Sequence, residues 1–358
     1  MKGAVIAWAL LMNSLAIQAS PILSLPIPNN NRSQWMLQGH RGALMPHRPD
    51  MEQLLGRVWT LSAERRILYR QYGLKATPYR GLLFNASHLG NPATGMAFGA
   101  GFSMGQVGVH GFDYSFAAGV GYVSQPYDAV SNPLNNAIGS HFNGMMRLQL
   151  GYSGKQISAH VGMLHFSNAY WRSPNLGINL PYISIARGLG MSVYERQHRY
   201  AYSPARQNAS LQSWVFWPSF RIGKVEYDLD DRTALVKSCL DLRIQHNRGD
   251  WRQRSPSFGL QVFHDPLYGY EKFKGMQERG LLALTEVAAF GGMEWTMDRW
   301  GFQVDLGWYL ARPDRRKYPF YEGVGFNYYL NPRSRIMVRL KANQFSADVM
   351  EWGWAYAF

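Results

Sequence analysis

The sequence has a single cysteine, Cys239, among its 358 residues. One cysteine cannot form a disulfide within the chain, which excludes a disulfide-stabilised secreted fold. Charged residues make up only 17% of the chain, a low share for a soluble domain. After the first 20 residues, no apolar run approaches the roughly 18 residues that a membrane-spanning helix needs. Ordinary transmembrane helices are therefore excluded as well.

The N-terminal segment MKGAVIAWALLMNSLAIQAS has the composition of a secretory signal peptide. Lys2 precedes an apolar stretch over residues 4–17, and small residues follow near position 20. We expect residues 1–20 to be a signal peptide, residues 21–32 an extended entry segment, and residues 21–358 one exported domain. A membrane anchor is the weaker alternative, because the apolar run is short for a spanning helix.

Aromatic residues make up 14% of the chain, and glycines number 36. An exported chain of this composition without helical spans is typical of an outer membrane β-barrel. The C-terminal residues MEWGWAYAF alternate in the same sense, because successive side chains of a strand point to opposite faces. One face carries large side chains, and the other carries a glutamate and small residues; the large ones are Met350, Trp352, Trp354, Tyr356 and Phe358.

The same period-two alternation recurs along the chain and predicts strands. A soluble sandwich would also alternate, but the aromatic ends of the apolar faces and the export signal favour lipid. We predict an all-β fold with no second domain: a single transmembrane antiparallel β-barrel of about 14 strands, with roughly 12 to 16 allowed because such barrels usually have an even number. The candidate strands are 33–42, 53–64, 79–87, 95–104, 112–124, 141–153, 156–167, 181–193, 211–223, 234–246, 256–264, 283–297, 299–310, 320–330, 334–344 and 348–358.

A histidine and a serine stand two residues apart in GMLHFSNAYWRSPNLGINLPYISI, residues 162–185. His165 and Ser167 share the more continuously apolar face of their strand, so we expect both to point towards lipid. If the chain forms a hairpin centred near Arg172, Asn179 lies opposite His165 on the same face. Polar groups on a lipid-facing wall are unfavourable unless they are partnered or used.

These groups suit acyl-ester cleavage. A histidine beside a serine hydroxyl can take its proton as general base, and a third group such as Asn179 can fix the tautomer of the ring. The Asn168 side chain or nearby backbone N–H groups can supply donors for the oxyanion. No metal and no cofactor is required. The plainer interpretation is a pair of polar residues that only hydrogen-bond lipid headgroups.

Four stretches resemble the lipid A 3-O-deacylase family of outer membrane barrels, also called acyloxyacyl hydrolases. They are GHRGALMPHRPDMEQLLG (39–56), GSHFNGMMRLQLGYS (139–153), HFSNA (165–169) and PNLGIN (174–179). The last two together are the most specific, because they stand at a strand–loop–strand turn. Nothing as specific is recognised after about residue 195.

The resemblance implies roles for individual residues on the outer wall of a barrel. His165 matches the family's base, Ser167 its nucleophile and Asn168 its oxyanion-hole asparagine. The sequence departs from the family at Asn179, where the best-known members have a catalytic glutamate, and at Tyr170, where a small residue is common. The chain is also longer than the family's eight-stranded form.

The resemblance predicts a serine esterase of the bacterial outer membrane that removes an ester-linked acyl chain, in particular the 3-O-linked chain, from lipid A of lipopolysaccharide. Its expected partners are lipopolysaccharide and outer membrane lipids, with no nucleic acid; a homodimer is left open. The net charge of +14 suits a lipid that carries phosphates or an aqueous lumen. A related phospholipase or acyltransferase is one alternative.

The other alternative is a non-enzymatic barrel, such as a porin, an adhesin or a structural protein. The long sequence after residue 195 and three basic residues expected to face the lumen, Arg243, Arg339 and Lys341, favour it. An open, charged lumen would indicate this alternative, whereas an outward-facing histidine beside the serine would indicate the esterase.

Overall fold

The computed structural model describes residues 32–46, 48–68, 76–108, 110–154, 156–189, 213–226, 234–247, 254–269, 281–297, 299–313, 319–343 and 346–358. The predicted signal peptide, and all but the last residue of the predicted entry segment, lie outside the described residues. Within the described ranges, no helix has the length and hydrophobicity to span a membrane.

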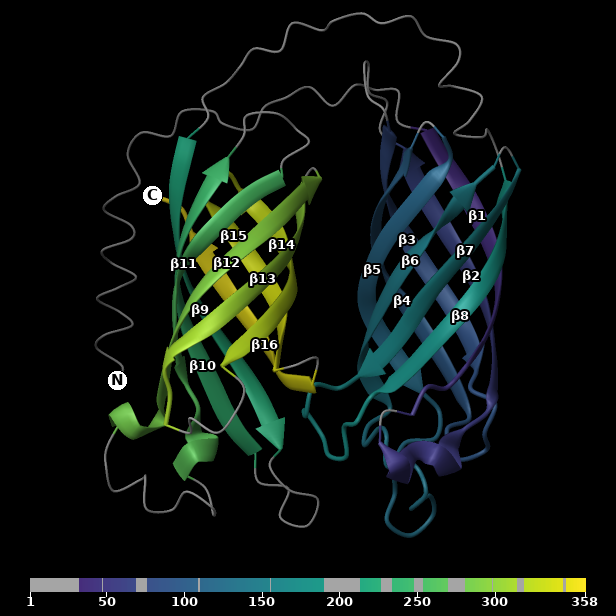
Figure 1. Ribbon diagram of the computed structural model, residues 1–358, viewed down its shortest axis with the longest axis horizontal. Coiled ribbons are helices and arrows are strands. Elements are labelled where there is room, and N and C mark those ends of the chain that lie inside the picture. Colours follow the sequence, from purple (N-terminus) through teal and green to yellow (C-terminus); the bar gives the residue numbers. More distant parts are fainter. Residues whose placement is uncertain are drawn as a thin grey trace, which may run out of the picture.

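The described chain forms two closed antiparallel barrels of eight strands each, side by side (Figure 1). The first barrel consists of β1 (Arg32–Ala43), β2 (Arg57–Leu68), β3 (Ala76–His88), β4 (Met96–Gly108), β5 (Phe112–Val123), β6 (Phe142–Ser153), β7 (Ile157–Ser167) and β8 (Ile178–Leu189). The second consists of β9 (Ser213–Glu226), β10 (Ala234–Asn247), β11 (Arg254–His264), β12 (Thr285–Met297), β13 (Trp300–Ala311), β14 (Phe320–Asn331), β15 (Ser334–Asn343) and β16 (Ser346–Tyr356). Short 3₁₀ helices occupy Pro49–Leu54 (η1), Pro266–Gly269 (η2) and Leu281–Leu284 (η4).

All-β antiparallel architecture is confirmed, but the predicted single barrel of about 14 strands is wrong. Each of the sixteen predicted strands overlaps an observed one. The observed sheet closes into two barrels instead of one, because β8 pairs with β1 and β16 pairs with β9. Alternation of side chains is the same in every strand of both barrels, so it carries no information about which distant strands close the sheet.

The strands present apolar side chains outwards and polar or small ones inwards. On β16, Trp352 is exposed while Glu351 and Ala355 are buried, as the alternation of the C-terminal residues predicts. On β7, Ile157 and Val161 are exposed while His160 is buried. The outer surface of each barrel is therefore the apolar one, which suits contact with lipid chains.

Paired charges fill the interior of the first barrel. Glu64 Oε2 lies 3.1 Å from Arg66 Nη2 and 3.0 Å from Arg147 Nη2, and Arg66 Nη1 lies 3.1 Å from Asp113 Oδ2. All four side chains are almost fully buried. Buried charges are tolerated only when they are paired and hydrogen-bonded, so this network fixes how the inward-facing side chains pack.

The second barrel is filled in the same way. Arg243 and Arg339 both pair with Asp305, at 2.9 and 3.2 Å. Lys341 Nζ lies 3.1 Å from Glu286 Oε2. These are the three basic residues that the sequence placed in a lumen, and there they are buried in ion pairs. Paired side chains occupy the lumen at this level, unlike the open, charged lumen that a channel would need.

Aromatic side chains join the two barrels. The ring centroids of Phe102 on β4 and Trp300 on β13 are 4.2 Å apart, and those of Phe116 on β5 and Phe302 on β13 are 4.1 Å apart. Aromatic pairs at such distances stabilise a contact beyond the area that they bury. These rings bring β4 and β5 of the first barrel against β13 of the second, and the axes of the two barrels are nearly parallel (Figure 1).

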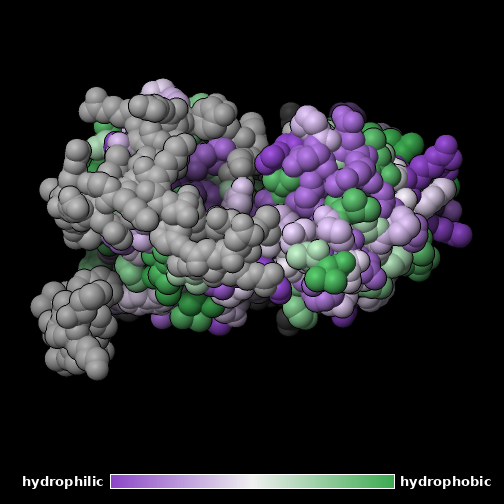
Figure 2. Space-filling view, turned by 90° about the horizontal axis from the view of Figure 1, so that it is seen from below, coloured by the Kyte–Doolittle hydropathy of each residue, from purple (hydrophilic) through white to green (hydrophobic). Residues whose placement is uncertain are grey.

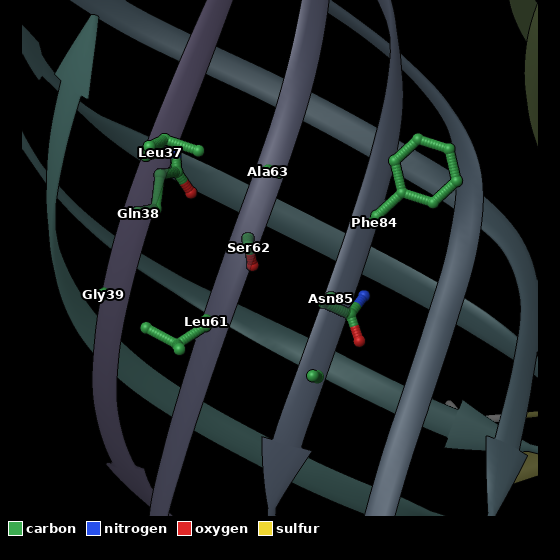
Figure 3. Close-up of a pocket in the computed structure, with 9 residues that line it drawn as sticks. Leu37, Gln38, Gly39, Leu61, Ser62, Ala63, Phe84 and Asn85 are labelled. Carbon is green, nitrogen blue, oxygen red and sulfur yellow. The ribbon is translucent and has the colours of Figure 1, made fainter.

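A shallow hollow of about 480 Å³ lies in the outer wall of the first barrel. Leu37, Leu61 and Phe84 line it together with small and polar residues of the same three strands, among them Gln38 and Asn85 (Figure 3). It lies on β1, β2 and β3, whereas the predicted site residues lie on β7, on β8 and in the turn between them. The hollow is thus a feature of the apolar wall, separate from the candidate site.

Candidate active site

The candidate site lies where β7 ends and β8 begins. The sequence predicts that His165 faces outwards opposite Asn179, and the register confirms it: the two residues are direct partners across β7 and β8. His165 is half-buried on the same face as the exposed Val161 and Met163. The imidazole therefore projects from the outer wall, away from the lumen.

Asn179 holds the histidine ring in one tautomer. His165 Nδ1 lies 2.7 Å from Asn179 Oδ1. An amide oxygen only accepts hydrogen bonds, so Nδ1 carries the proton and donates it. In the neutral ring, Nε2 is then the basic nitrogen. This is the tautomer that a general base for the serine requires.

Gly177 leaves room for the imidazole. A Cβ atom at this position would lie 2.9 Å from His165 Cε1, and the glycine has a φ of +81°. A larger residue would therefore meet both a contact with the ring and a strained backbone. Gly177 belongs to the PNLGIN stretch, but the sequence alone gave it no role.

Ser167 is buried inside the turn that follows β7. Its Oγ donates to Asn175 Oδ1 at 3.1 Å and lies 3.2 Å from the backbone N of Ala169, which donates to it. The backbone N–H of Asn168 donates to the same Asn175 oxygen, at 2.9 Å. Asn175 thus holds the hydroxyl and the start of the turn together, a role that sequence reasoning missed.

The other end of the Asn175 amide makes no such hydrogen bond among the described residues. Its Nδ2 is buried, and among the described residues no hydrogen-bond acceptor pairs with it. A buried donor without a partner is unfavourable by about 1–3 kcal/mol and often marks a functional position. Asn175 belongs to the PNLGIN motif and stands between the two strands that carry the predicted site. That position was the sequence signal that could have indicated its role.

The Asn168 side chain is hydrogen-bonded within and beside the turn. The sequence predicts that its side-chain amide, or backbone N–H groups nearby, donate to an oxyanion. Its Nδ2 instead donates to Ser140 Oγ at 2.9 Å and to the backbone oxygen of Arg172 at 2.7 Å. Both amide hydrogens are then engaged, because the turn folds back against the loop before β6. In this arrangement the side chain fastens the turn.

The turn has a tight backbone. The N–H of Trp171 donates to the Asn168 oxygen at 2.9 Å, and the two residues between them, Ala169 and Tyr170, have φ values of 52° and 61°. These are the features of a type I′ turn, which glycine or asparagine normally favours. Tyr170 therefore occupies a left-handed position.

The loop before β6 is hydrogen-bonded to the segment that leads from the turn into β8. The N–H groups of Leu176 and Gly177 both donate to the Ala137 oxygen. At Gly139, a Cβ atom would collide with the Ser173 oxygen. From this end, hydrophilic residues cover much of the first barrel (Figure 2). The site thus lies at the boundary between a polar rim and an apolar wall.

Fold and site together define the class: a β-barrel protein with a histidine–asparagine pair on its outer wall and a serine two residues further along the same strand. Two family models match the chain, and each falls largely on one barrel. Lipid A 3-O-deacylase (PagL) matches residues 56–186, and the C-terminal domain of acyloxyacyl hydrolase matches residues 219–358. Both matches fall on the lipid A 3-O-deacylase and acyloxyacyl hydrolase group that the sequence motifs resemble.

Solved structures give more distant matches. A crystal structure of the outer membrane enzyme PagL is 19% identical, with a TM-score of 0.30 and coverage of 42% of this chain and 97% of that one. A triple mutant of Rhodopseudomonas blastica porin is 11% identical, with a TM-score of 0.19 and coverage of 91% of this chain and 100% of that one. No curated protein matches the sequence.

Proposed function

We propose that this protein is a serine esterase of the outer membrane that hydrolyses the 3-O-linked acyl ester of lipid A. The observation that carries the proposal is the His165–Asn179 pair on the outer wall, two residues from Ser167 along the strand. The match of residues 56–186 to the lipid A 3-O-deacylase model supports an outer membrane lipid A deacylase. The serine mechanism and the 3-O position are the finer parts of the proposal.

The reaction begins at Ser167. Its hydroxyl turns from Asn175 towards His165 Nε2, which takes the proton as the oxygen attacks the ester carbonyl carbon. The ester bond to the sugar then breaks, and the imidazolium returns the proton to the departing sugar oxygen. A water molecule, deprotonated by the same nitrogen, releases the fatty acid from the serine and restores the hydroxyl.

The tetrahedral intermediates carry a negative oxygen that needs hydrogen-bond donors. Asn175 Nδ2 is a buried amide without a partner among the described residues, and its oxygen already contacts Ser167. The N–H of Ala169 points at the Ser167 oxygen. We assign these two groups to the oxyanion hole, in place of the Asn168 side chain.

The position of the site suits a membrane lipid. Each barrel has an even number of strands, so β7 ends opposite the end at which β1 begins and β8 finishes. The longer connections of the first barrel, 44–56 and 124–141, lie at the end where β7 finishes. Longer loops are extracellular in such barrels. This supports a site at the outer headgroup level, with the ester near the headgroups and the acyl chain in the bilayer.

A lipid A mass spectrum tests the proposal directly. Bacteria that express the full chain should lose one 3-hydroxyacyl chain from lipid A, relative to the same strain with an empty vector. A spectrum unchanged by well-folded, outer-membrane-inserted protein contradicts the function. Loss of a fatty acid from phospholipids instead would assign the site to a phospholipase.

Asn179 should tolerate the family's acid. Asn179→Glu supplies a negative charge beside the imidazolium, so we expect kcat to stay equal or to rise, by no more than the roughly 10⁴-fold that separates acid from amide in serine proteases. Asn179→Ala leaves Nδ1 without this acceptor and should lower kcat. A folded Asn179→Glu barrel with lower activity than wild type would mean that the amide itself is required.

A further inference from the structure

The turn that holds Ser167 is bound by the second barrel as well as the first. Glu226, the last residue of β9, donates its backbone N–H to the Tyr170 oxygen at 2.7 Å. One of its carboxylate oxygens accepts the Ser173 N–H at 3.2 Å. The Glu226 side chain is 11% exposed. A single residue of the second barrel therefore contacts the turn at two places, Tyr170 and Ser173.

Tyr170 and Trp171 extend the same contact. Lys224 lies on β9, two residues before Glu226, and its ammonium is 5.1 Å from the centre of the Trp171 ring. Burial raises the pKa of the Tyr170 hydroxyl. The side chain of Trp171 thus adds a contact with the second barrel to the backbone hydrogen bond at Tyr170.

A second contact lies on the wall beside the site. Gly144 on β6 is the direct partner of Ser167, and Met146 is the partner of His165. A Cβ atom at Gly144 would lie 3.1 Å from Met350 Cε, which belongs to β16 of the second barrel. Cross-strand partners share one face of a sheet, so Met350 packs on the outward face that carries the histidine and the serine.

We propose that the second barrel completes the active site of the first: Glu226 is a positioning residue for the turn that carries Ser167 and its oxyanion donors, and Met350 forms one wall of the acyl-chain site. The inference rests on the proposed esterase function and adds a role for the second barrel to it. Methionine is flexible and fills irregular apolar space, which suits a wall that contacts a fatty acyl chain.

The positioning role is tested with the full-length protein in detergent micelles, by measuring release of 3-hydroxy fatty acid from purified lipid A. Glu226→Ala removes the acceptor for the Ser173 N–H, so we expect kcat to fall by about 10- to 100-fold with KM little changed. Glu226→Gln retains an oxygen acceptor and should recover most of the rate. Glu52→Ala, an exposed carboxylate on η1, is the matched control and should behave as wild type.

The wall is tested in the same assay with lipid A that carries a shorter or a longer 3-hydroxyacyl chain. Met350→Ala should change the ratio of kcat/KM for the two chains by about 10-fold, within the range expected for a few methylenes in an apolar pocket. Met293→Ala, on the outer wall of β12, is the matched control. Met350→Leu, similar in volume, should keep the wild-type ratio.

The outcomes separate the inference from the function on which it rests. Suppose that the wild-type protein is active, that folded Glu226→Ala has the wild-type kcat, and that Met350→Ala leaves the kcat/KM ratio for the two acyl chains unchanged. These results leave the esterase function standing and overturn the role of the second barrel. A fall in the amount of folded protein, with unchanged kcat per folded molecule, also overturns it, because it shows a purely structural contact. Inactive wild type overturns both.

Discussion

Ser167→Ala and His165→Ala should each abolish release of the 3-hydroxyacyl chain, with kcat lower by about 10⁴- to 10⁶-fold. The first change removes the nucleophile. The second removes the base, whose Nδ1 lies 2.7 Å from Asn179 Oδ1 and donates its proton to that oxygen. Because the two groups act as one unit, the double variant should be no worse than either single variant. Mass spectra of lipid A from expressing bacteria, and fatty-acid release by purified protein, measure the effect.

Ser33→Ala is a suitable control, because Ser33 is an exposed serine on β1. It should retain full activity and the same resistance of the folded barrel to detergent. Appreciable turnover by Ser167→Ala would remove the serine from the reaction. It would favour direct attack by water on the ester, with His165 as the base.

Asn175→Asp should lower kcat by at least about 10²- to 10³-fold, the usual effect of removing one oxyanion donor. The aspartate keeps an oxygen for the Ser167 hydroxyl and the Asn168 N–H. It loses the Nδ2 donor and places a negative charge where negative charge develops. The turn should therefore keep its shape, while the oxyanion of the transition state loses a hydrogen-bond donor.

The same substitution elsewhere provides the comparison. Asn331 is exposed, and its Oδ1 accepts a backbone N–H from Arg333, which an aspartate can also accept. Asn331→Asp should leave kcat unchanged. If Asn175→Asp also retains the wild-type rate, the oxyanion donors lie elsewhere in the turn, and the assignment of Nδ2 fails.

The sequence predicted much of the fold because strand alternation is a local property. The sixteen candidate segments match the observed strands to within a few residues, although the predicted total was about 14. The parity of His165, with its pairing to Asn179, followed from counting around one hairpin. The number of barrels did not follow. Closure depends on contacts between β1 and β8 and between β9 and β16, strands far apart in sequence that carry no distinguishing pattern.

The site was predictable in part for a similar reason. His165, Ser167 and Asn179 stand on regular strands or at their ends, where geometry follows from spacing. The atoms of Asn168 and Asn175 are arranged by a turn with two left-handed residues, and spacing does not specify such geometry. Glu226 was missed because it approaches from another barrel, 53 residues from Ser173.

The even strand count of each barrel has a consequence for how such proteins arise. A unit of eight strands returns the chain to the membrane face from which it started, so a second unit can be appended in one genetic step without inverting the first. An odd-numbered addition would deliver the next segment to the opposite face. Here the second unit also contacts the turn after Ser167 through Glu226, so the two barrels are held together by more than the chain that connects them.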